Sequence, residues 1–477
     1  MTTEEKRLSR IVLVNPPFSY FPQAGRRSFN YARPPLGLAY LAASLQQKLG
    51  SSVEVRIIDC IAEKIGAADE LEKILLAAAP DVVGFSVVTA TRDIAGEMAV
   101  RLHTRLPNCR VVLGGPHITA LPDEPAPGVD AIFVGEGEES LAEYVRRAVP
   151  EQRREPIDGC IQLLPGGEKL RGGECPFIDP LDRVPMPAID LLPREAYLHS
   201  YPHRYRRFMT MLTSRGCPFG CRFCANEFLW KSQVRFFSVE RVTEEIDRLA
   251  GRFGVDLVFI EDDTFLARPD RAVQIMRYIR DRQPGMKWIC HTRADTITPE
   301  LADEMAASRC VEVQIGAESG SAAVLRETNK KLELADIRRA FALLKKTQIR
   351  TWATFIVGNP GETPENVEET IRFAIEIDPT YSSFIMMLPF PGTRTYDLYR
   401  QKGFITAKSW SEYSWHGKPV FATDTLSHEQ LVNLRRKAYR RFFLRPSKLL
   451  RTFVDVLRAN SVREIWRAFW YWYSLAR

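Results

Sequence analysis

Short apolar runs rich in Val and Ile alternate with helical patterns over residues 10–148, and this alternation limits the fold more than any other feature. Runs of this kind favour buried strands, and each is followed by a turn signal. Five buried strands joined by helices predict a doubly wound parallel sheet, which binds ligands at the carboxyl ends of its strands. The five runs are Ile11–Val14, Val53–Ile58, Val82–Val88, Arg110–Leu113 and Ala131–Val134.

A second series of strands and helices begins at Phe208. In its first helical stretch, Ser238 is the predicted N-cap and the apolar residues fall on one face. Six such units predict a partial (β/α)6 parallel barrel, so the fold class is α/β in both halves. The six strand candidates are 208–213, 257–260, 287–291, 311–315, 351–357 and 383–388.

Between the two series the pattern is lost, and Pro, Gly and charged residues accumulate, which indicates a linker. A chain of 477 residues is long enough for two or three domains. The start MTTEEKRLSR is no signal peptide, and no stretch approaches the ~20 apolar residues of a membrane span, so we expect a cytoplasmic protein. The predicted parts are a sheet domain at 8–148, a linker at 149–205, the barrel at 206–400 and a helical carboxyl-terminal region at 401–477.

Three of the nine cysteines are crowded into one loop, Cys217-Pro-Phe-Gly-Cys221-Arg-Phe-Cys224, directly after the first predicted strand of the barrel. Thiolates at this spacing suit zinc or an iron-sulfur cluster. A structural zinc site normally takes a fourth Cys or His, and the nearest histidines, His199 and His203, precede the strand. A cubane held by three cysteines instead leaves one iron open to a substrate. A zinc loop stays open as the alternative.

The spacing, with Phe223 before the last cysteine and a predicted barrel behind it, resembles the radical S-adenosylmethionine (SAM) superfamily. The resemblance implies that Cys217, Cys221 and Cys224 hold a 4Fe-4S cluster, with Phe223 beside the cofactors. In that family the open iron chelates SAM, and the reduced cluster cleaves it to a 5′-deoxyadenosyl radical. An electron donor such as flavodoxin or ferredoxin is implied as a partner.

Further strand ends of the barrel match the family residue by residue. The resemblance implies that Glu261 and Asp262 lie near the methionine amino group of SAM, although the usual Gly-Gly-Glu is absent. It implies that Arg293 binds the SAM carboxylate and that Glu318 and Ser319 bind its ribose. A helix cap for the acids and an internal ion pair for Arg293 or Glu318 stay open as structural alternatives. The turns at 358–362 and 389–393 are predicted walls of the same site.

The strand ends of the amino-terminal sheet carry no G-x-G-x-x-G after the first strand, which argues against a nicotinamide or flavin dinucleotide. The motifs of this part of the chain are Asn15-Pro16-Pro17, Arg33-Pro34-Pro35-Leu36-Gly37-Leu38, Gly114-Gly115-Pro116-His117 and Gly135-Glu136-Gly137-Glu138. Placed before the barrel, they look like the flavodoxin- or Rossmann-like domain of the cobalamin-binding (B12-binding) radical SAM subgroup. The Asp-x-His-x-x-Gly segment that supplies a cobalt ligand in many cobalamin proteins is absent. Two alternatives stay open: the sheet binds no cofactor, or His117 only forms a hydrogen bond within its own turn. The implied cobalamin contacts are Pro16, Thr89, Gly114, Gly115, His117, Gly135 and Glu136.

The carboxyl-terminal region is basic and aromatic. Residues 430–477 hold twelve Lys and Arg against two acids, a charge of +10, whereas the other residues sum to −3, so the net charge of +7 comes from this region. We expect helices that dock on the barrel. A membrane-surface helix is the alternative, because Trp and Tyr beside Arg suit an anionic lipid interface. We expect no nucleic acid partner, since no base-reading module accompanies the charge.

The subgroup resemblance implies an enzyme that methylates an unactivated carbon of a small or hydrophobic metabolite, using cobalamin, SAM and the cluster. An oxidative cyclase or ring-rearranging enzyme of the same subgroup is the first alternative. The alternative from another class is a non-catalytic metal-binding or interaction protein. No motif in the sequence names the substrate.

Overall fold

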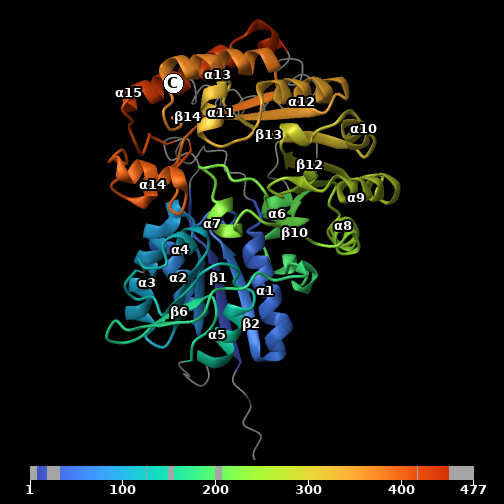
Figure 1. Cartoon of the computed structure of the whole chain (residues 1–477). Coiled ribbons are helices and arrows are strands. Elements are labelled where there is room, and N and C mark those ends of the chain that lie inside the picture. Colours follow the sequence, from blue (N-terminus) through green and yellow to red (C-terminus); the bar gives the residue numbers. More distant parts are fainter. Residues whose placement is uncertain are drawn as a thin grey trace, which may run out of the picture. The chain divides into compact units, whose positions relative to one another are not determined.

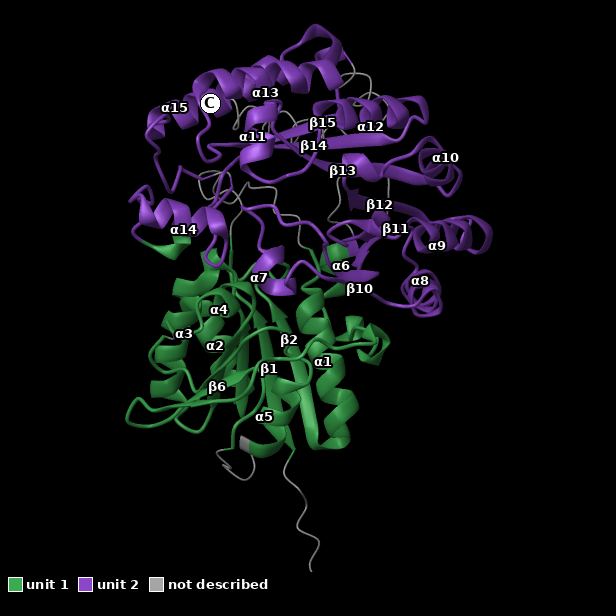
Figure 2. Ribbon diagram, viewed as in Figure 1, with its two compact units in different colours: residues 1–18, 32–197, 409–411 green, residues 19–31, 198–408, 412–477 purple. Residues whose placement is uncertain are grey.

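The computed structural model describes residues 8–18, 33–124, 126–148, 155–198, 207–415 and 417–450. They form two compact units, each built on its own sheet (Figure 1, Figure 2). Unit 1 comprises residues 1–18, 32–197 and 409–411, and unit 2 comprises residues 19–31, 198–408 and 412–477. The predicted α/β class is confirmed in both.

A seven-stranded sheet forms the centre of unit 1, in the order β2-β1-β3-β4-β5-β6-β7. Its first five strands run parallel, as the doubly wound prediction requires. Each begins and ends within about two residues of the run that predicted it. The strands are β1 (Ser9–Asn15), β2 (Val53–Asp59), β3 (Val82–Ser86), β4 (Arg110–Gly114) and β5 (Ala131–Phe133).

The prediction that 149–205 is a linker is wrong for part of that segment. Residues Cys160–Leu163 form β6, which pairs antiparallel with β5, and Lys169–Arg171 form β7, which pairs antiparallel with β6. Both strands are short, and the turn between them contains Gly166 and Gly167 in the left-handed region. A turn rich in Pro and Gly thus concealed a two-stranded extension of the sheet.

Both faces of the sheet in unit 1 are covered by helices. Ile11 and Leu13 of β1 join the apolar core on one face, and Val12 and Val14 join the core on the other. This alternation is the two-residue period of a strand. The first core also receives α1 and α5, and the second receives α2 and α3. The helices are α1 (Leu36–Leu49), α2 (Ala68–Ala78), α3 (Arg92–Arg105), α4 (Pro116–Ala120), α5 (Ser140–Ala148) and α6 (Arg194–Leu198).

Unit 2 contains the predicted series of six parallel strands, in the order β15-β14-β13-β12-β11-β8. Because β8 and β15 are the two edges of this described sheet, the barrel is partial. All six predicted strands are confirmed. They are β8 (Phe208–Met211), β11 (Leu257–Ile260), β12 (Lys287–Thr292), β13 (Cys310–Glu318), β14 (Arg350–Val357) and β15 (Tyr381–Met386).

One local difference concerns the cysteine loop, which does not follow β8 directly. Ser214–Gly216 first form a short strand, β9, that pairs antiparallel with β10 (Val234–Phe236). The cysteine loop therefore begins after β9, and the chain returns to pair with β9 at β10.

Helices connect the barrel strands, and Ser238 caps α8 as predicted, with its side chain accepting from the N–H of Arg241. The helices of unit 2 are α7 (Asn226–Trp230), α8 (Val239–Phe253), α9 (Pro269–Arg282), α10 (Pro299–Ala307), α11 (Ala322–Glu327), α12 (Leu334–Lys346), α13 (Pro364–Ile377), α14 (Arg394–Gln401) and α15 (His428–Phe443).

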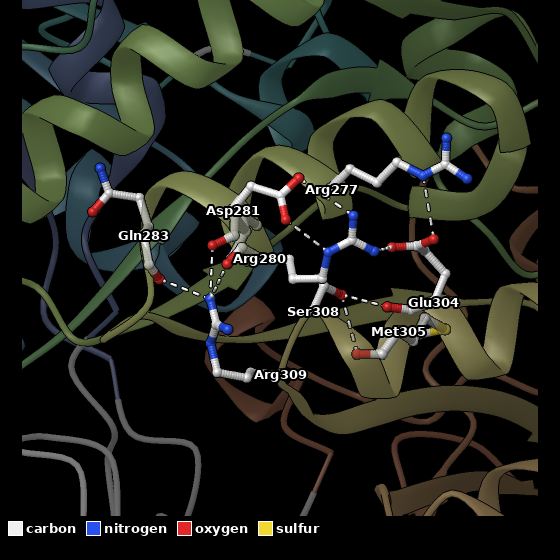
Figure 3. A network of polar contacts seen from close by, with 9 residues as sticks. Arg277, Arg280, Asp281, Gln283, Glu304, Met305, Ser308 and Arg309 are labelled. Atoms are coloured by element: carbon white, nitrogen blue, oxygen red, sulfur yellow. Dashed lines mark hydrogen bonds and ion pairs between the residues drawn. The ribbon is translucent and has the colours of Figure 1, made fainter.

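Arg309 holds the carboxyl end of α9 (Figure 3). Its guanidinium donates to backbone carbonyls of the last turn of α9 and of the segment that follows it. Arg280 of α9 also binds Glu304 of α10 at 2.8 Å, so the network ties the two helices together. The carbonyls that accept from Arg309 belong to Ile279, Arg280, Gln283 and Met286.

In the carboxyl-terminal region, α15 packs against β15 and α13. The hydroxyl of Tyr439 on α15 accepts from the N–H of Phe384 on β15 at 3.2 Å. This part of the region docks on the barrel, as expected. The membrane-surface alternative falls mainly on residues 451–477, which lie outside the described residues. Within the described ranges, no helix combines the length and the apolar character needed to cross a membrane.

Candidate active site and cofactor sites

The three-cysteine loop of unit 2 is folded by the side chain of Asn226. Its Oδ1 accepts from the N–H of Cys217 at 2.8 Å, and its Nδ2 donates to the carbonyls of Cys217 and Phe219 at 2.6 and 3.1 Å. The N–H of Cys224 donates to the carbonyl of Cys221 at 3.0 Å. One buried amide and one turn therefore set the backbone that carries all three thiols.

Segments far along the chain hold the middle of the loop. The Nδ2 of Asn329 donates to the carbonyl of Gly220 at 2.6 Å, and the N–H of Arg222 donates to the carbonyl of Thr328 at 3.0 Å. The carbonyl of Arg222 in turn accepts from the N–H of Thr395 at 3.0 Å. The loop is thus anchored to the segments that follow β13 and β15.

The three thiols are free, and none forms a disulfide. Burial raises the pKa of Cys224 to about 12 and also raises the pKa of Cys221, although Lys330 acts against the latter shift. Iron binds the thiolate form, so loading a cluster here must release protons. In the part of the chain that the structure describes, no three His, Cys, Asp or Glu side chains gather as a single metal ion would require.

The acidic residues after β11 divide between two surroundings. Asp262 is buried, and its carboxylate accepts from the N–H and hydroxyl groups of Thr213 and Ser214 at 2.5–3.1 Å. Asp262 therefore has a structural role, but it holds the segment after β8 and does not cap a helix as the sequence alternative proposed. The Oε2 of Glu261 lies 3.5 Å from Nε2 of His291 at the end of β12, so the structure places Glu261 at the rim. A contact of either acid with SAM stays a prediction.

Arg293, after β12, is buried beneath the cysteine loop. Its guanidinium carbon lies 3.6 Å from the ring centre of Phe219, which is within cation–π distance. Two of its nitrogens bind the carboxylate of Asp295 at 3.0 Å, and Nη2 also donates to the carbonyls of Lys330 and Lys331. The internal ion pair that the sequence allowed is therefore present. Its contact with the SAM carboxylate stays a prediction.

Glu318 ends β13 with a backbone φ of 62°, in the left-handed region. Its Oε1 accepts from the ammonium of Lys330 at 2.8 Å. Burial disfavours the charged ammonium, but the carboxylate outweighs this effect, and the pKa of Lys330 is raised. A Cβ at Gly316 would lie 2.2 Å from that same Oε1, so glycine is required for the ion pair. The hydroxyl of Ser319 pairs with that of Thr370 at 3.0 Å.

The rim turn after β14 contains a buried acid and a buried amide. The Oε2 of Glu362 accepts from the N–H groups of Gly358 and Asn359 at 2.6 and 3.1 Å, and burial raises its pKa to about 7. The Oδ1 of Asn359 is buried and has no hydrogen-bond partner among the described residues. An acceptor of this kind is one that a bound ligand would satisfy. Phe223, also predicted near the cofactors, is half-buried.

In unit 1 the structure brings His117 and Thr89 together at the carboxyl edge of the sheet. The Nδ1 of His117 lies 3.3 Å from the hydroxyl oxygen of Thr89, and the backbone N–H of His117 donates to the carbonyl of Val87. The imidazole meets the ring of Trp410 edge-on at 4.9 Å. Burial and the charge of Arg92 lower the pKa of His117 to about 4, so the ring is neutral at neutral pH.

The glycines at this edge make close approaches within unit 1 itself. Gly115 has a φ of 101°, and a Cβ there would lie 2.8 Å from the backbone of Val87. The carbonyl of Gly114 accepts from the N–H of the same Val87 at 2.8 Å. Gly135 has a φ of 86° and faces Cys175, whose Cβ would be 3.1 Å from an added Cβ. The fold of unit 1 therefore requires glycine at 115 and 135, whatever the edge binds.

Glu136 and Pro16 complete the predicted edge. The carboxylate of Glu136 is buried and accepts from the N–H of Ile178 at 2.8 Å, so it holds the segment beyond β7. Pro16 is buried after β1, next to Asn15, whose side chain donates to Asp59 at 2.8 Å. The predicted cobalamin contacts thus share one sheet edge, and their contact with the cofactor stays a prediction.

Sequence reasoning missed four residues that shape the barrel site. Asn226 and Asn329 fix the cysteine loop, Lys330 neutralises Glu318, and Thr264 lies beside the sulfur of Cys217. Three of them lie 40 or more residues from the cysteines, in segments without a motif of their own. Asn226, two residues after Cys224, is the one that proximity to the loop could have suggested.

The donor sets fit the groups that the sequence resemblance implies. Three free thiols on one anchored turn, with buried charges and an unsatisfied amide oxygen on the same set of strand ends, suit an iron-sulfur cluster and a polar ligand beside it. The edge of unit 1 offers a neutral histidine, a threonine and aromatic surface.

Comparison with known proteins agrees with this geometry. Residues 211–374 match the family model of the radical SAM superfamily, and residues 23–145 match that of the B12 binding domain. The chain is 32% identical over 449 residues to an uncharacterized methyltransferase of Pyrococcus horikoshii, covering 93% of this chain and 95% of that protein.

Two further similarities cover most of the chain. It is 28% identical to the anaerobic magnesium-protoporphyrin IX monomethyl ester cyclase of Rubrivivax gelatinosus, over 87% of this chain and 75% of that protein. Its fold is similar to that of the radical SAM methyltransferase TsrM from Kitasatospora setae, solved with cobalamin and a [4Fe-4S] cluster. The TM-score is 0.67 at 21% identity, over 84% of this chain and 80% of that chain.

The radical SAM match lies in unit 2 and most of the B12-binding match lies in unit 1, and the Pyrococcus relative aligns over nearly the whole chain. The protein is therefore an enzyme with a [4Fe-4S] cluster, SAM and cobalamin as its cofactors, and the non-catalytic alternative is excluded. The chain belongs to the radical SAM superfamily, in the subgroup with an amino-terminal B12-binding domain.

Proposed function

We propose that this enzyme transfers a methyl group to an unactivated carbon of a small or hydrophobic metabolite. The observation that carries the proposal is the anchored three-cysteine loop at the strand ends of the barrel, in a chain that also has the B12-type sheet. When bound, the cluster with SAM supplies a radical and cobalamin supplies a methyl group. The similarity to a methyltransferase over 93% of the chain supports this choice.

In this proposal Cys217, Cys221 and Cys224 each bind one iron as thiolates. Asn226 and Asn329 keep the loop in one conformation while the sulfurs lose their protons, because their amides bind backbone atoms rather than thiols. The positive charges of Lys330 and Arg293 favour the thiolate form of Cys221.

The polar groups around the loop would orient SAM in the barrel. In this proposal Glu261, at the end of β11, accepts from the methionine amino group. The Oδ1 of Asn359, which has no hydrogen-bond partner among the described residues, accepts from a further donor. Glu318 is held in place by Lys330, so a ribose hydroxyl would meet a carboxylate of fixed orientation.

In unit 1 the neutral imidazole of His117, fixed by Thr89, would line the cobalamin site. The cluster must also receive an electron from outside the chain, and we propose a flavodoxin or ferredoxin as its donor.

Anaerobic reconstitution with iron and sulfide tests the cluster assignment. The wild-type chain should bind about four irons and cleave SAM to 5′-deoxyadenosine when reduced, and replacing Cys217, Cys221 or Cys224 with Ala should abolish both. Cys175→Ala is the matched control, because this cysteine lies in unit 1, and it should retain cluster and cleavage. A fully loaded, reduced wild-type cluster that leaves SAM intact would contradict the proposal.

Product analysis separates methyl transfer from the cyclase alternative, which the similarity to the Rubrivivax cyclase favours. With cobalamin and a candidate substrate, a methyltransferase should form S-adenosylhomocysteine alongside 5′-deoxyadenosine and a product heavier by one CH2. A cyclase should form 5′-deoxyadenosine with no S-adenosylhomocysteine. Observing the second pattern with the true substrate would replace methyl transfer by cyclisation.

A further inference from the structure

The sulfur of Cys217 has a hydroxyl neighbour. Thr264, three residues beyond Glu261, places its Oγ1 3.5 Å from Sγ of Cys217. The side chain is buried, with 2% of its surface exposed, so water does not compete for this contact. A separation of 3.5 Å between oxygen and sulfur lies within hydrogen-bond distance for the larger sulfur atom.

The direction of this hydrogen bond is fixed once Cys217 binds iron. A coordinated thiolate has no proton, so the hydroxyl of Thr264 must be the donor. The same hydroxyl donates to the carbonyl of Asp263 at 2.7 Å, so this carbonyl is the competing acceptor, and the proton must turn from it to the sulfur when Cys217 binds iron. As the sulfur becomes more negative on reduction of the cluster, it becomes the stronger acceptor of the two.

A second sulfur of the loop also has a donor, but one of a different kind. Burial raises the pKa of the Cys224 thiol overall, although the backbone of Asn226 lowers it. No side-chain substitution removes a backbone donor cleanly. Thr264 is therefore the donor whose effect on the cluster can be isolated.

We propose that Thr264 donates a hydrogen bond to the cluster sulfur of Cys217 and thereby raises the reduction potential of the cluster. A hydrogen bond to a ligand sulfur stabilises the more negative, reduced cluster more than the oxidised one. Thr264 is a positioning and tuning residue in this proposal, because it acts through Cys217. The inference rests on the proposed cluster site and adds control of its potential.

The test compares the midpoint potentials of reconstituted full-length proteins in a redox titration followed by EPR. Thr264→Val keeps the shape of the side chain and removes the donor, so its midpoint should be more negative than that of the wild type. Thr264→Ser keeps the hydroxyl and should stay near the wild-type value. Thr351→Val is the matched control, because Thr351 is a buried threonine near the amino end of β14, at the opposite end of the strand from the cluster site. The midpoint potential of this variant should equal that of the wild type.

Iron and sulfide contents are measured first, because they separate the proposed cluster site from the proposed role of Thr264. A wild-type chain that binds no cluster would contradict the proposed function. A cluster-loaded Thr264→Val protein whose midpoint potential equals that of the wild type would overturn this inference alone. If Thr264→Val loads poorly, resonance Raman spectra of the wild type in H2O and D2O give an independent result. A deuterium shift of the Fe–S(Cys) stretch in the wild type that persists undiminished in Thr264→Ala would likewise overturn it.

Discussion

His117 shows how burial sets the chemistry of one side chain. Its ring is 3% exposed, faces Thr89 and Trp410, and has its pKa lowered to about 4 by burial and by Arg92, with Asp93 acting weakly in the opposite direction. An imidazole that stays neutral can accept a hydrogen bond or contact an apolar surface without a charge. This state lets His117 contact a bound cofactor without placing a buried charge beside it.

The same shift predicts how stability depends on pH. An unfolded histidine titrates near pH 6.5, so between about pH 6.5 and 4 the unfolded chain binds a proton that folded His117 does not. The free energy of unfolding should therefore fall as the pH falls through this window, by at most about 3 kcal/mol. Urea unfolding of the wild type and His117→Gln across this range measures the effect. Parallel pH profiles for the two proteins would show that His117 contributes nothing.

At the scale of elements, a buried ion pair joins the end of β13 to the segment between α11 and α12. The pair is formed by Glu318 and Lys330, and Gly316, which has no side chain, leaves room for it. The strand bulges between Gly316 and Glu318, which turns the carboxylate toward the cysteine loop. Burial raises the pKa of Cys221, and the negative charge of this carboxylate raises it further. A bulge at a strand end is a common way to aim a functional side chain.

Removing one partner of this pair should be costly, because it leaves a buried charge without compensation. Lys330→Met should lower the free energy of unfolding of unit 2 by about 3–5 kcal/mol, measured in urea. The double variant Glu318→Gln with Lys330→Met removes both charges and should recover part of this loss. Equal destabilisation by the single and the double variant would argue that packing, rather than charge, makes the contribution.

At the scale of the whole molecule, two units carry two cofactor domains within one chain. Residues 409–411 belong to unit 1 although they follow α14 of unit 2 in sequence. There the carboxylate of Asp93 accepts from the hydroxyl of Ser409 and the N–H of Ser411. The segment 409–411 therefore carries Trp410 to the ring of His117.

This division predicts two separate footprints in hydrogen exchange. Hydroxocobalamin should slow exchange at 114–119 and 135–138 in unit 1, because a ligand protects the edge that it covers. SAM added to the cluster-loaded protein should slow exchange at 217–224 and 358–362 in unit 2. The peptide that covers α9 is the internal control and should not change. Protection by hydroxocobalamin confined to unit 2 would contradict the assignment of the B12 site.

The sequence by itself determined the order of strands and helices, the two series of βα units and the three-cysteine loop. Each rests on local information: a two-residue or helical period, a turn residue, or a fixed spacing of thiols. These signals survive in a single sequence because a strand buried on both faces must be apolar along its whole length. The short strands β6 and β7 were not predicted, because three or four residues are too few to show a two-residue period.

Tertiary structure alone decided which groups meet. Lys330 reaches Glu318 and Thr264 reaches Cys217 across 12 and 47 residues. The parallel register of β8, β11 and β13 brings their carboxyl ends to one rim, and no local pattern encodes which side chains then touch. The same packing gave Arg293 and Asp262 partners inside the protein. The sequence thus named the chemistry of the site, and the register and packing of the strands decided its geometry.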